Sequence, residues 1–327
     1  MKKITTVLAL FIVIGLNAQD YVEFTNAELT YSQDFNALES AEGSTNIPWT
    51  NGLTPLLGWS AAKLMQDPDP QDIAIYSTGS LTTTGATGLV SFGTDTDRAL
   101  GSRIANATGD VAYGVKIKNS TTAPIVALQV TYTGEQWTYA NPCPQVLTFA
   151  YKLNANIKDT AFTVVPELQF SSPIFVEGAT TTTKIDGNLA ENKVVGITHT
   201  FNVTIPVGDS IMLRWLDIND PGTTDCAGGV DHALSIDDFS VTATLQSGVH
   251  QTREGNIKLY VGQDELIIKG DNVMNEIVVY NALGHRMHSQ LIGANETTVT
   301  VNHLASGVYF ARFALADGSS SIIRFIK

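Results

Sequence analysis

The stretch Val111-Ala-Tyr-Gly-Val-Lys-Ile-Lys118 decides the fold class. Every second residue in it is large and apolar, while the residues between are small or charged. This period of two is that of a β-strand with one buried face and one exposed face. The same alternation recurs in three further stretches, at residues 126–132, 147–153 and 211–215.

Polar clusters separate these stretches, for example at residues 82–85 and 178–183, where Thr and Gly predominate. Such clusters are typical of turns and surface loops. The chain shows no regular alternation of strands with helical patterns, so an α/β nucleotide-binding fold is not expected. Many short strands joined by polar connections predict an all-β fold, a jelly-roll-like β-sandwich.

The first 18 residues have the pattern of a signal peptide. Met1-Lys2-Lys3 is positively charged, residues 4–15 are apolar, and Ala18 precedes the expected cleavage before Gln19. The apolar run is shorter than the roughly 20 residues with which a helix crosses a bilayer. No later stretch is long and apolar enough to span a membrane. We therefore expect an exported protein without a transmembrane segment.

Charge divides the chain into two parts. The formal net charge is −13, but residues 257–327 carry six Lys or Arg and six Asp or Glu, so the excess of acid lies before them. A polar stretch without a strand pattern, residues 246–255, lies at this change. We predict a β-sandwich module at 19–246, a linker at 247–256 and a second domain at 257–327. The acidity argues against nucleic acid or anionic lipid as partners, because both require a basic surface.

The second domain contains three recognisable elements. These are a strand ending in Tyr280-Asn-Ala-Leu-Gly284, the turn and strand Leu304-Ala-Ser-Gly-Val-Tyr-Phe310, and the basic Lys327. Their order resembles the type A C-terminal sorting domain of type IX secretion substrates in Bacteroidetes. The family commonly opens with a Pro-Asn-Pro segment, where this chain has residues 260–265. An ordinary immunoglobulin-like domain is the alternative.

The resemblance implies a small immunoglobulin-like β-sandwich and a route of export. The type IX translocon would recognise the domain after Sec export, and the domain would then usually be cleaved. The remaining protein would be released or attached to surface lipopolysaccharide. We accordingly expect a secreted protein or one on the outer-membrane surface.

An acidic segment, residues 217–238, holds six Asp, one Asn and no Lys or Arg. Clustered carboxylates are the ligands that Ca²⁺ prefers, although the spacing is not that of an EF-hand. The strand that follows, Leu234-Ser-Ile-Asp-Asp-Phe-Ser-Val241, resembles the closing strand of jelly-roll carbohydrate-binding modules. That resemblance implies a structural Ca²⁺ at Asp237, with Asp34 as a partner on the first strand. The predicted metal ligands are Asp34, Asp217, Asp220 and Asp237; a solvated loop is the alternative.

The two cysteines, Cys143 and Cys226, are expected to form a disulfide, because disulfides persist in exported proteins; two free thiols are the alternative. A bridge would bring the loop after Trp137 against the acidic segment. The predicted ligand-binding residues there are Glu135, Trp137, Tyr139 and His232. Aromatic faces beside carboxylates and amides are suited to sugars. The alternative is that Trp137 and Trp215 are core residues, since Trp is usually well buried.

Catalytic motifs are not evident in the sequence. It has no Gly-x-Ser-x-Gly elbow, no His-Glu-x-x-His helix and no Walker loop. A glycosidase needs only two suitably spaced carboxylates. Glu135 could pair with Asp231 or Asp238, so a glycan-active hydrolase remains an alternative hypothesis. A surface module that binds glycan or mediates adhesion is favoured. The hydrolase and a structural surface protein are the alternatives.

Overall fold

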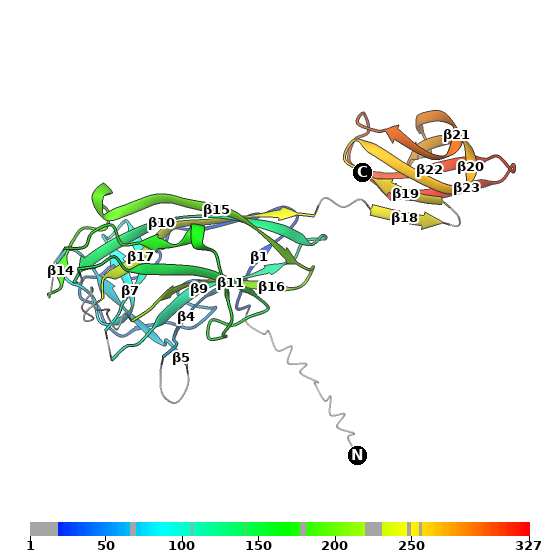
Figure 1. The fold of residues 1–327 in the computed structure, drawn as a ribbon. Helices are drawn as coiled ribbons and strands as arrows, with labels where there is room; N and C mark the ends of the chain where they lie inside the picture. Colours follow the sequence, from blue (N-terminus) through cyan, green and yellow to red (C-terminus); the bar gives the residue numbers. More distant parts are fainter. Residues whose placement is uncertain are drawn as a thin grey trace, which may run out of the picture. The chain divides into compact units, whose positions relative to one another are not determined.

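The computed structural model describes residues 19–65, 70–105, 107–140, 142–176, 181–219, 231–246 and 257–327, and the backbone of residues 250–254. The chain divides into two compact units, one ending at Leu245 and the other beginning at Gln246 (Figure 1). The predicted signal peptide lies outside the described residues, as do residues 247–249 and 255–256 of the predicted linker. No helix among the described residues has the length and apolar character needed to cross a membrane.

The first unit is built from two sheets, which Figure 1 shows as two layers. The central part of one sheet consists of β11 (Val146–Leu153), β16 (Ser210–Asp217), β9 (Val111–Asn119) and β4 (Trp59–Lys63), in that order. The short strands of this sheet are β12 (Thr163–Val164) and β13 (Phe170–Ser171) on β11, β1 (Val22–Phe24) on β9, and β5 (Gln71–Asp72) on β4.

The other sheet has β10 and β17 at its centre. Its order is β14 (Thr183–Lys184), β10 (Ile125–Tyr139), β17 (Ala233–Leu245), β8 (Arg98–Arg103), β7 (Gly88–Gly93), β6 (Ile75–Gly79) and β3 (Ile47–Pro48). β15 (Lys193–Ile205) also pairs with β10, and β2 (Thr30–Gln33) pairs with β17. Two short 3₁₀ helices, η1 (Pro166–Leu168) and η2 (Ala190–Asn192), complete the elements described for this unit.

The core lies between the two sheets. The alternating residues of β9 point into it, because Val111, Tyr113, Val115 and Ile117 all belong to the main hydrophobic cluster. An aromatic group fills its centre: Trp59, Trp215, Tyr132, Phe149 and Phe239, of which Trp59 and Trp215 stack with ring centroids 5.9 Å apart. Aromatic side chains bury large apolar areas, so this group is a main source of the unit's stability. The prediction of an all-β fold is confirmed.

The strand near the start of the first unit pairs with the strand at its end. β2 lies antiparallel to β17, with Thr30 opposite Thr242 and Ser32 opposite Ser240. The two threonine hydroxyls are 3.0 Å apart. The sheet is therefore completed by a pairing between distant parts of the sequence.

The second unit is a smaller all-β structure. Its strands are β18 (His250–Glu254), β19 (Ile257–Val261), β20 (Glu265–Asn281), β22 (Val308–Leu315) and β23 (Ser320–Ile326) in spatial order, with β21 (Arg286–Thr300) also on β20. A separate core holds this unit together, with Tyr309, Phe313 and Phe325 as its aromatic members.

Candidate functional site

The predicted ligand residues Glu135 and Trp137 lie on β10, and both are buried. Each side chain is only 2% exposed. The Trp137 ring stacks on Phe92 at 5.6 Å between centroids, and a side chain at Gly187 would meet the same ring at 2.4 Å. Its Nε1 donates hydrogen bonds to Glu135 Oε2 at 3.2 Å and to Ser235 Oγ at 3.0 Å. A ring enclosed in this way has no free face on which a sugar could stack.

Two buried carboxyls on the same sheet, those of Glu135 and Asp237, have raised pKa values. Burial raises the pKa of Glu135 to about 8, and the nearby charge of Asp237 raises it further, while Lys193 opposes the shift. Burial likewise raises the pKa of Asp237 to about 7, with Asp97 and Asp34 among the repelling charges. The Glu135 carboxyl is therefore enclosed by protein in this structure, and its pairing with Asp231 or Asp238 in a hydrolase stays a hypothesis.

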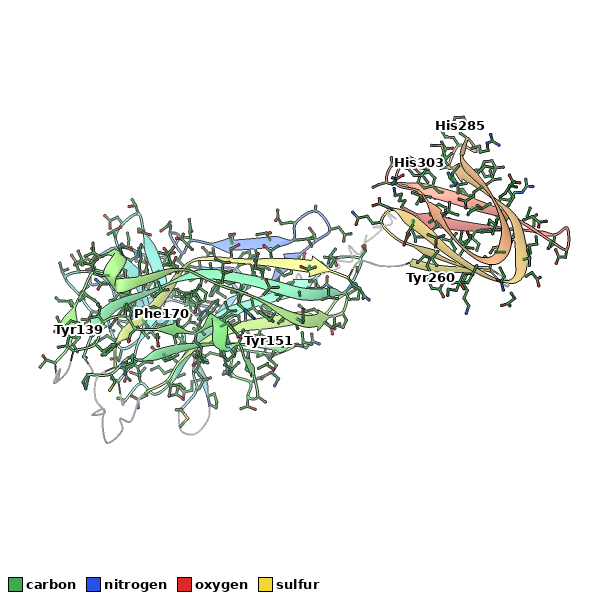
Figure 2. All side chains as sticks on the ribbon, turned by 45° about the horizontal axis from the view of Figure 1, so that its top comes forward. Tyr139, Tyr151, Phe170, Tyr260, His285 and His303 are labelled. Carbon is green, nitrogen blue, oxygen red and sulfur yellow. The ribbon has the colours of Figure 1, made fainter. Side chains whose placement is uncertain are left out.

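The other two predicted ligand residues lie in different environments. His232 is fully buried, its Nδ1 lies 3.1 Å from Gln136 Nε2, and its backbone N–H donates to Gln145 Oε1. Tyr139 is partly exposed at the end of β10, at one end of the first unit (Figure 2). Three of the four predicted ligand residues are therefore interior residues, because segments distant in sequence cover this end of β10.

The predicted metal ligands belong to two different groups of carboxylates. Asp217 is buried at the end of β16, where it accepts a 2.5 Å hydrogen bond from Ser102 Oγ. Burial raises its pKa well above the usual range, and Asp231 and Asp110 add to the shift. Asp237 is on the other sheet and has different charged neighbours. Asp217 and Asp237 thus lie on strands of different sheets and share none of the charged neighbours that shift their pKa values.

Asp237 retains one feature of a cation ligand. Its side chain is 5% exposed, and its Oδ1 has no hydrogen-bond partner among the described residues. Asp34 is exposed and its Oδ1 accepts from the backbone N–H of Asn36 at 3.2 Å. Asp220 lies outside the described residues. Within the part of the chain that the structure describes, no group of three or more His, Cys, Asp or Glu is placed to hold a metal ion.

Cys143 lies in the loop between β10 and β11. Its expected partner, Cys226, is outside the described residues. The disulfide therefore stays a prediction.

A cleft of about 210 Å³ lies elsewhere in the first unit, beside β5 and β6. Its walls combine hydroxyl, amide and charged side chains with the half-exposed Ile75. The polar side chains that line it are Thr45, Asn46, Lys63, Gln71, Asp72, Ser77 and Thr87. Such a mixture can bind a small polar ligand through several hydrogen bonds while an apolar wall contacts its carbon skeleton.

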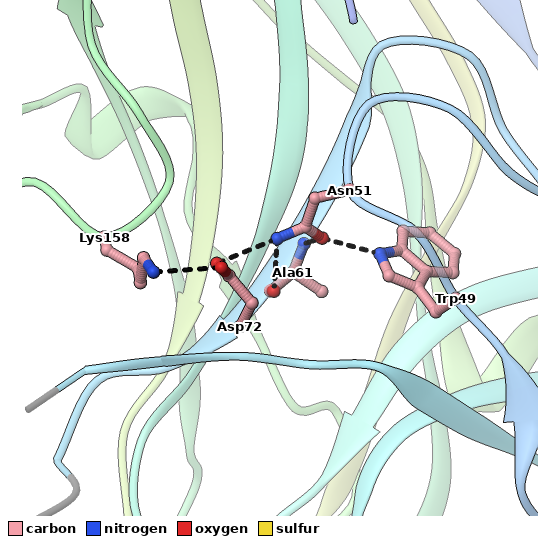
Figure 3. Close-up of polar contacts among 5 residues, drawn as sticks. All are labelled: Trp49, Asn51, Ala61, Asp72 and Lys158. Carbon is pink, nitrogen blue, oxygen red and sulfur yellow. Dashed lines mark hydrogen bonds and ion pairs between the residues drawn. The ribbon is translucent and has the colours of Figure 1, made fainter.

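Asp72 is held in a fixed position at this cleft (Figure 3). Its Oδ2 accepts from Lys158 Nζ and its Oδ1 from Asn51 Nδ2, both at 3.0 Å. Asn51 is itself fixed, because its Oδ1 accepts 2.8 Å hydrogen bonds from Trp49 Nε1 and from the backbone N–H of Ala61. One polar group of the cleft, the Asp72 carboxylate, is therefore oriented by its neighbours, which reduces the entropy lost on binding.

Sequence reasoning missed this cleft. Its residues are scattered over positions 45–89 and form no motif. The one available signal was composition, since this segment mixes Asn, Gln, Ser and Thr with few charges. Such a composition is equally typical of loops, so it did not identify a site.

Comparison with known proteins identifies the second unit. Residues 262–327 match the family model described as the secretion system C-terminal sorting domain. None of the curated proteins compared with the chain matches it.

Solved structures show only distant likenesses. A DUF3244 family protein with an immunoglobulin-like β-sandwich fold from Bacteroides vulgatus is 16% identical, covering 25% of this chain and 97% of that one, with a TM-score of 0.21. The adhesin domain of Epf from Streptococcus pyogenes is 13% identical, covering 88% and 97%, with a TM-score of 0.28. The N-terminal CBM22-1–CBM22-2 tandem domain of Xyn10C from Paenibacillus barcinonensis is 11% identical, covering 90% and 88%, with a TM-score of 0.29. At these TM-scores the likenesses support no conclusion about function.

The family match agrees with the resemblance seen in the motifs at residues 280–284 and 304–310. Residues 262–327 are a secretion system C-terminal sorting domain, which directs the protein through the type IX secretion system to the cell surface or the medium.

Proposed function

We propose that the exported protein binds glycan, and that the cleft beside Asp72 is the binding site. The observation that carries this proposal is the carboxylate of Asp72, which lines the cleft and is oriented from behind by hydrogen bonds from Asn51 and Lys158. Sugars present many hydroxyl groups in defined directions, so they are bound best by donors and acceptors that are already oriented.

The size and charge of the cleft restrict the class of glycan that it could bind. Its volume of about 210 Å³ is below the roughly 300 Å³ at which pockets for drug-sized molecules begin, so it suits a single sugar unit, such as the end of a glycan chain. Lys63 and Asp72 supply one charge of each sign. The acidic excess of this part of the chain disfavours polyanionic glycans, because like charges repel. A neutral sugar is the expected ligand class.

The test is binding of the full mature chain to an array of glycans, followed by titration of the best ligand. Gln71→Ala and Asp72→Ala should each weaken binding by up to about tenfold, the equivalent of one lost hydrogen bond. Gln169→Ala, which removes an exposed amide elsewhere in the unit, should leave the affinity unchanged. Failure of the wild-type protein to bind any glycan would overturn the function, and full binding by the Gln71 and Asp72 variants would overturn the site.

We also propose that a structural Ca²⁺ binds at Asp237. The support is the buried Oδ1 without a hydrogen-bond partner among the described residues, together with the repelling charges of Asp34 and Asp97. Ca²⁺ would neutralise these charges, and carbonyl and water oxygens would complete its ligands. Its role would be to stabilise the fold.

A further inference from the structure

One turn in the sorting domain contains a leucine whose side chain does not stabilise the turn. In the hairpin between β20 and β21, Asn281 Oδ1 accepts from the backbone N–H of Leu283 at 3.0 Å and of His285 at 2.9 Å. Gly284 has a φ of 78°, which favours glycine. Asn281 and Gly284 therefore account for the turn, whereas the Leu283 side chain is 80% exposed. His285, after the turn, also lies on the surface (Figure 2).

A groove of about 350 Å³ lies beside this turn. Ala282 and Gly284, which flank Leu283 closely, are among its lining residues. Its apolar walls come from neighbouring strands: Tyr280 on β20, Phe310 opposite it on β22, and Ile322 on β23. Aromatic and aliphatic side chains that line a concave surface are the usual anchors of a protein interface.

Arginines border this groove. Arg312 lines it, Arg286 pairs with Tyr280 across β20 and β21, and Arg324 pairs with Phe310 across β22 and β23. All three are exposed, and among the described residues none of them forms an ion pair. Half of the six basic residues of an otherwise neutral domain thus gather around one groove. This concentration gives the groove a positive potential and makes it complementary to carboxylates.

We propose that this groove, with Leu283 at its rim, is the surface by which the sorting domain docks on the type IX translocon. The partner is an acidic protein loop that places an apolar side chain between Tyr280 and Phe310 and carboxylates against the arginines. The phosphates of lipopolysaccharide would satisfy the arginines alone. The apolar walls and the exposed Leu283 favour a protein partner instead. Apolar side chains of a protein can cover these surfaces and exclude water from them, whereas phosphates cannot.

The experiment follows the full-length protein in a bacterium that possesses the type IX system. Leu283→Ser and Arg312→Glu should each lower the amount at the cell surface at least tenfold, as loss of an interface anchor does, with the folded protein retained in the periplasm. Melting temperatures should match wild type, since both side chains are exposed. The matched controls are Leu291→Ser, an equally exposed leucine outside the groove, and Lys258→Glu on β19; both should be exported normally.

Three results would overturn the proposal. The first is normal export of both groove variants, in an assay where deletion of residues 256–327 does cause retention; sorting by the domain would then stand without this surface. The second is an equal defect in the control variants. The third is passage of the groove variants into the medium without surface retention, which would assign the groove to lipopolysaccharide.

Discussion

The indole Nε1 of Trp137 donates a 3.2 Å hydrogen bond to Oε2 of Glu135, two residues earlier on the same strand. The bond keeps a carboxyl group inside a covered part of the sheet, next to the second buried carboxyl of Asp237. Two such groups cannot both be ionised without a large cost in free energy, because burial removes their solvation and their charges repel.

This pair predicts that stability falls as pH rises. The folded-state pKa of Glu135 is raised from 4.5 to about 8 and that of Asp237 from 3.8 to about 7, so the folded protein binds more protons than the unfolded chain between these values. The contribution of the two protonated carboxyls to the free energy of unfolding is fully present below about pH 4. It is lost as pH rises through the folded-state pKa values of about 7 and about 8. Denaturant unfolding in the presence of chelator, from pH 5 to pH 9, measures it.

Replacing the carboxyl of Glu135 isolates its contribution. Glu135→Gln keeps the shape and the hydrogen-bond acceptor but cannot ionise, so the decline in stability towards pH 9 should become shallower. Glu191→Gln, at an exposed carboxyl in η2, is the matched control and should leave the profile as in wild type. An unchanged slope in Glu135→Gln would show that this carboxyl does not cause the pH dependence.

Loss of the Asn51 side chain should destabilise the first unit and weaken the cleft. Asn51→Ala leaves the buried Trp49 Nε1 and the backbone N–H of Ala61 without their acceptor. The free energy of unfolding should fall by about 1–3 kcal/mol for each donor that water does not reach. Asn202→Ala, at an exposed position on β15, should change the free energy of unfolding by less than about 0.5 kcal/mol. Chemical denaturation compares the two, and equal midpoints would contradict the role given to Asn51.

Calcium should raise the melting temperature if it binds at Asp237. A ligand at about a hundredfold over its Kd stabilises the native state by about 2.7 kcal/mol. Asp237→Ala should abolish the response, and Asp264→Ala in the sorting domain should preserve it. Equal melting temperatures of metal-free wild-type protein in chelator and in millimolar Ca²⁺ would refute the metal proposal.

The predicted disulfide is tested by mass spectrometry of unreduced, natively exported protein. A bridge between Cys143 and Cys226 should appear as one linked peptide pair, and it would contribute about 4 kcal/mol by the chain-entropy model. Alkylation of both thiols without prior reduction would exclude it.

The sequence predicted the strands better than the site. The period of two at residues 111–118 places Tyr113 and Val115 in the core as expected, because the pleat alone fixes which side chains share a face. The residues of a strand do not indicate which other segments of the chain pack against its outer face. Trp137 became an interior residue because Phe92 and Gly187, from other segments, pack against it.

Proximity in sequence is also a poor guide to which carboxylates lie together. Asp217 and Asp237 flank one acidic segment, yet the chain changes sheets between them. Conversely, the cleft unites residues as distant as Thr45 and Thr87 through strand pairing. Only the topology reveals either relationship.

The pairing of β2 with β17 has a consequence for the order of events during translocation. When a chain crosses a membrane with its N-terminus first, Thr30 emerges long before Thr242. β2 therefore cannot pair until β17 has also emerged. Closing so long a loop is slow, because its entropy is lost before the contact forms. The topology therefore delays completion of the sandwich until nearly the whole first unit has crossed the membrane. This delay keeps the first unit unfolded while it crosses.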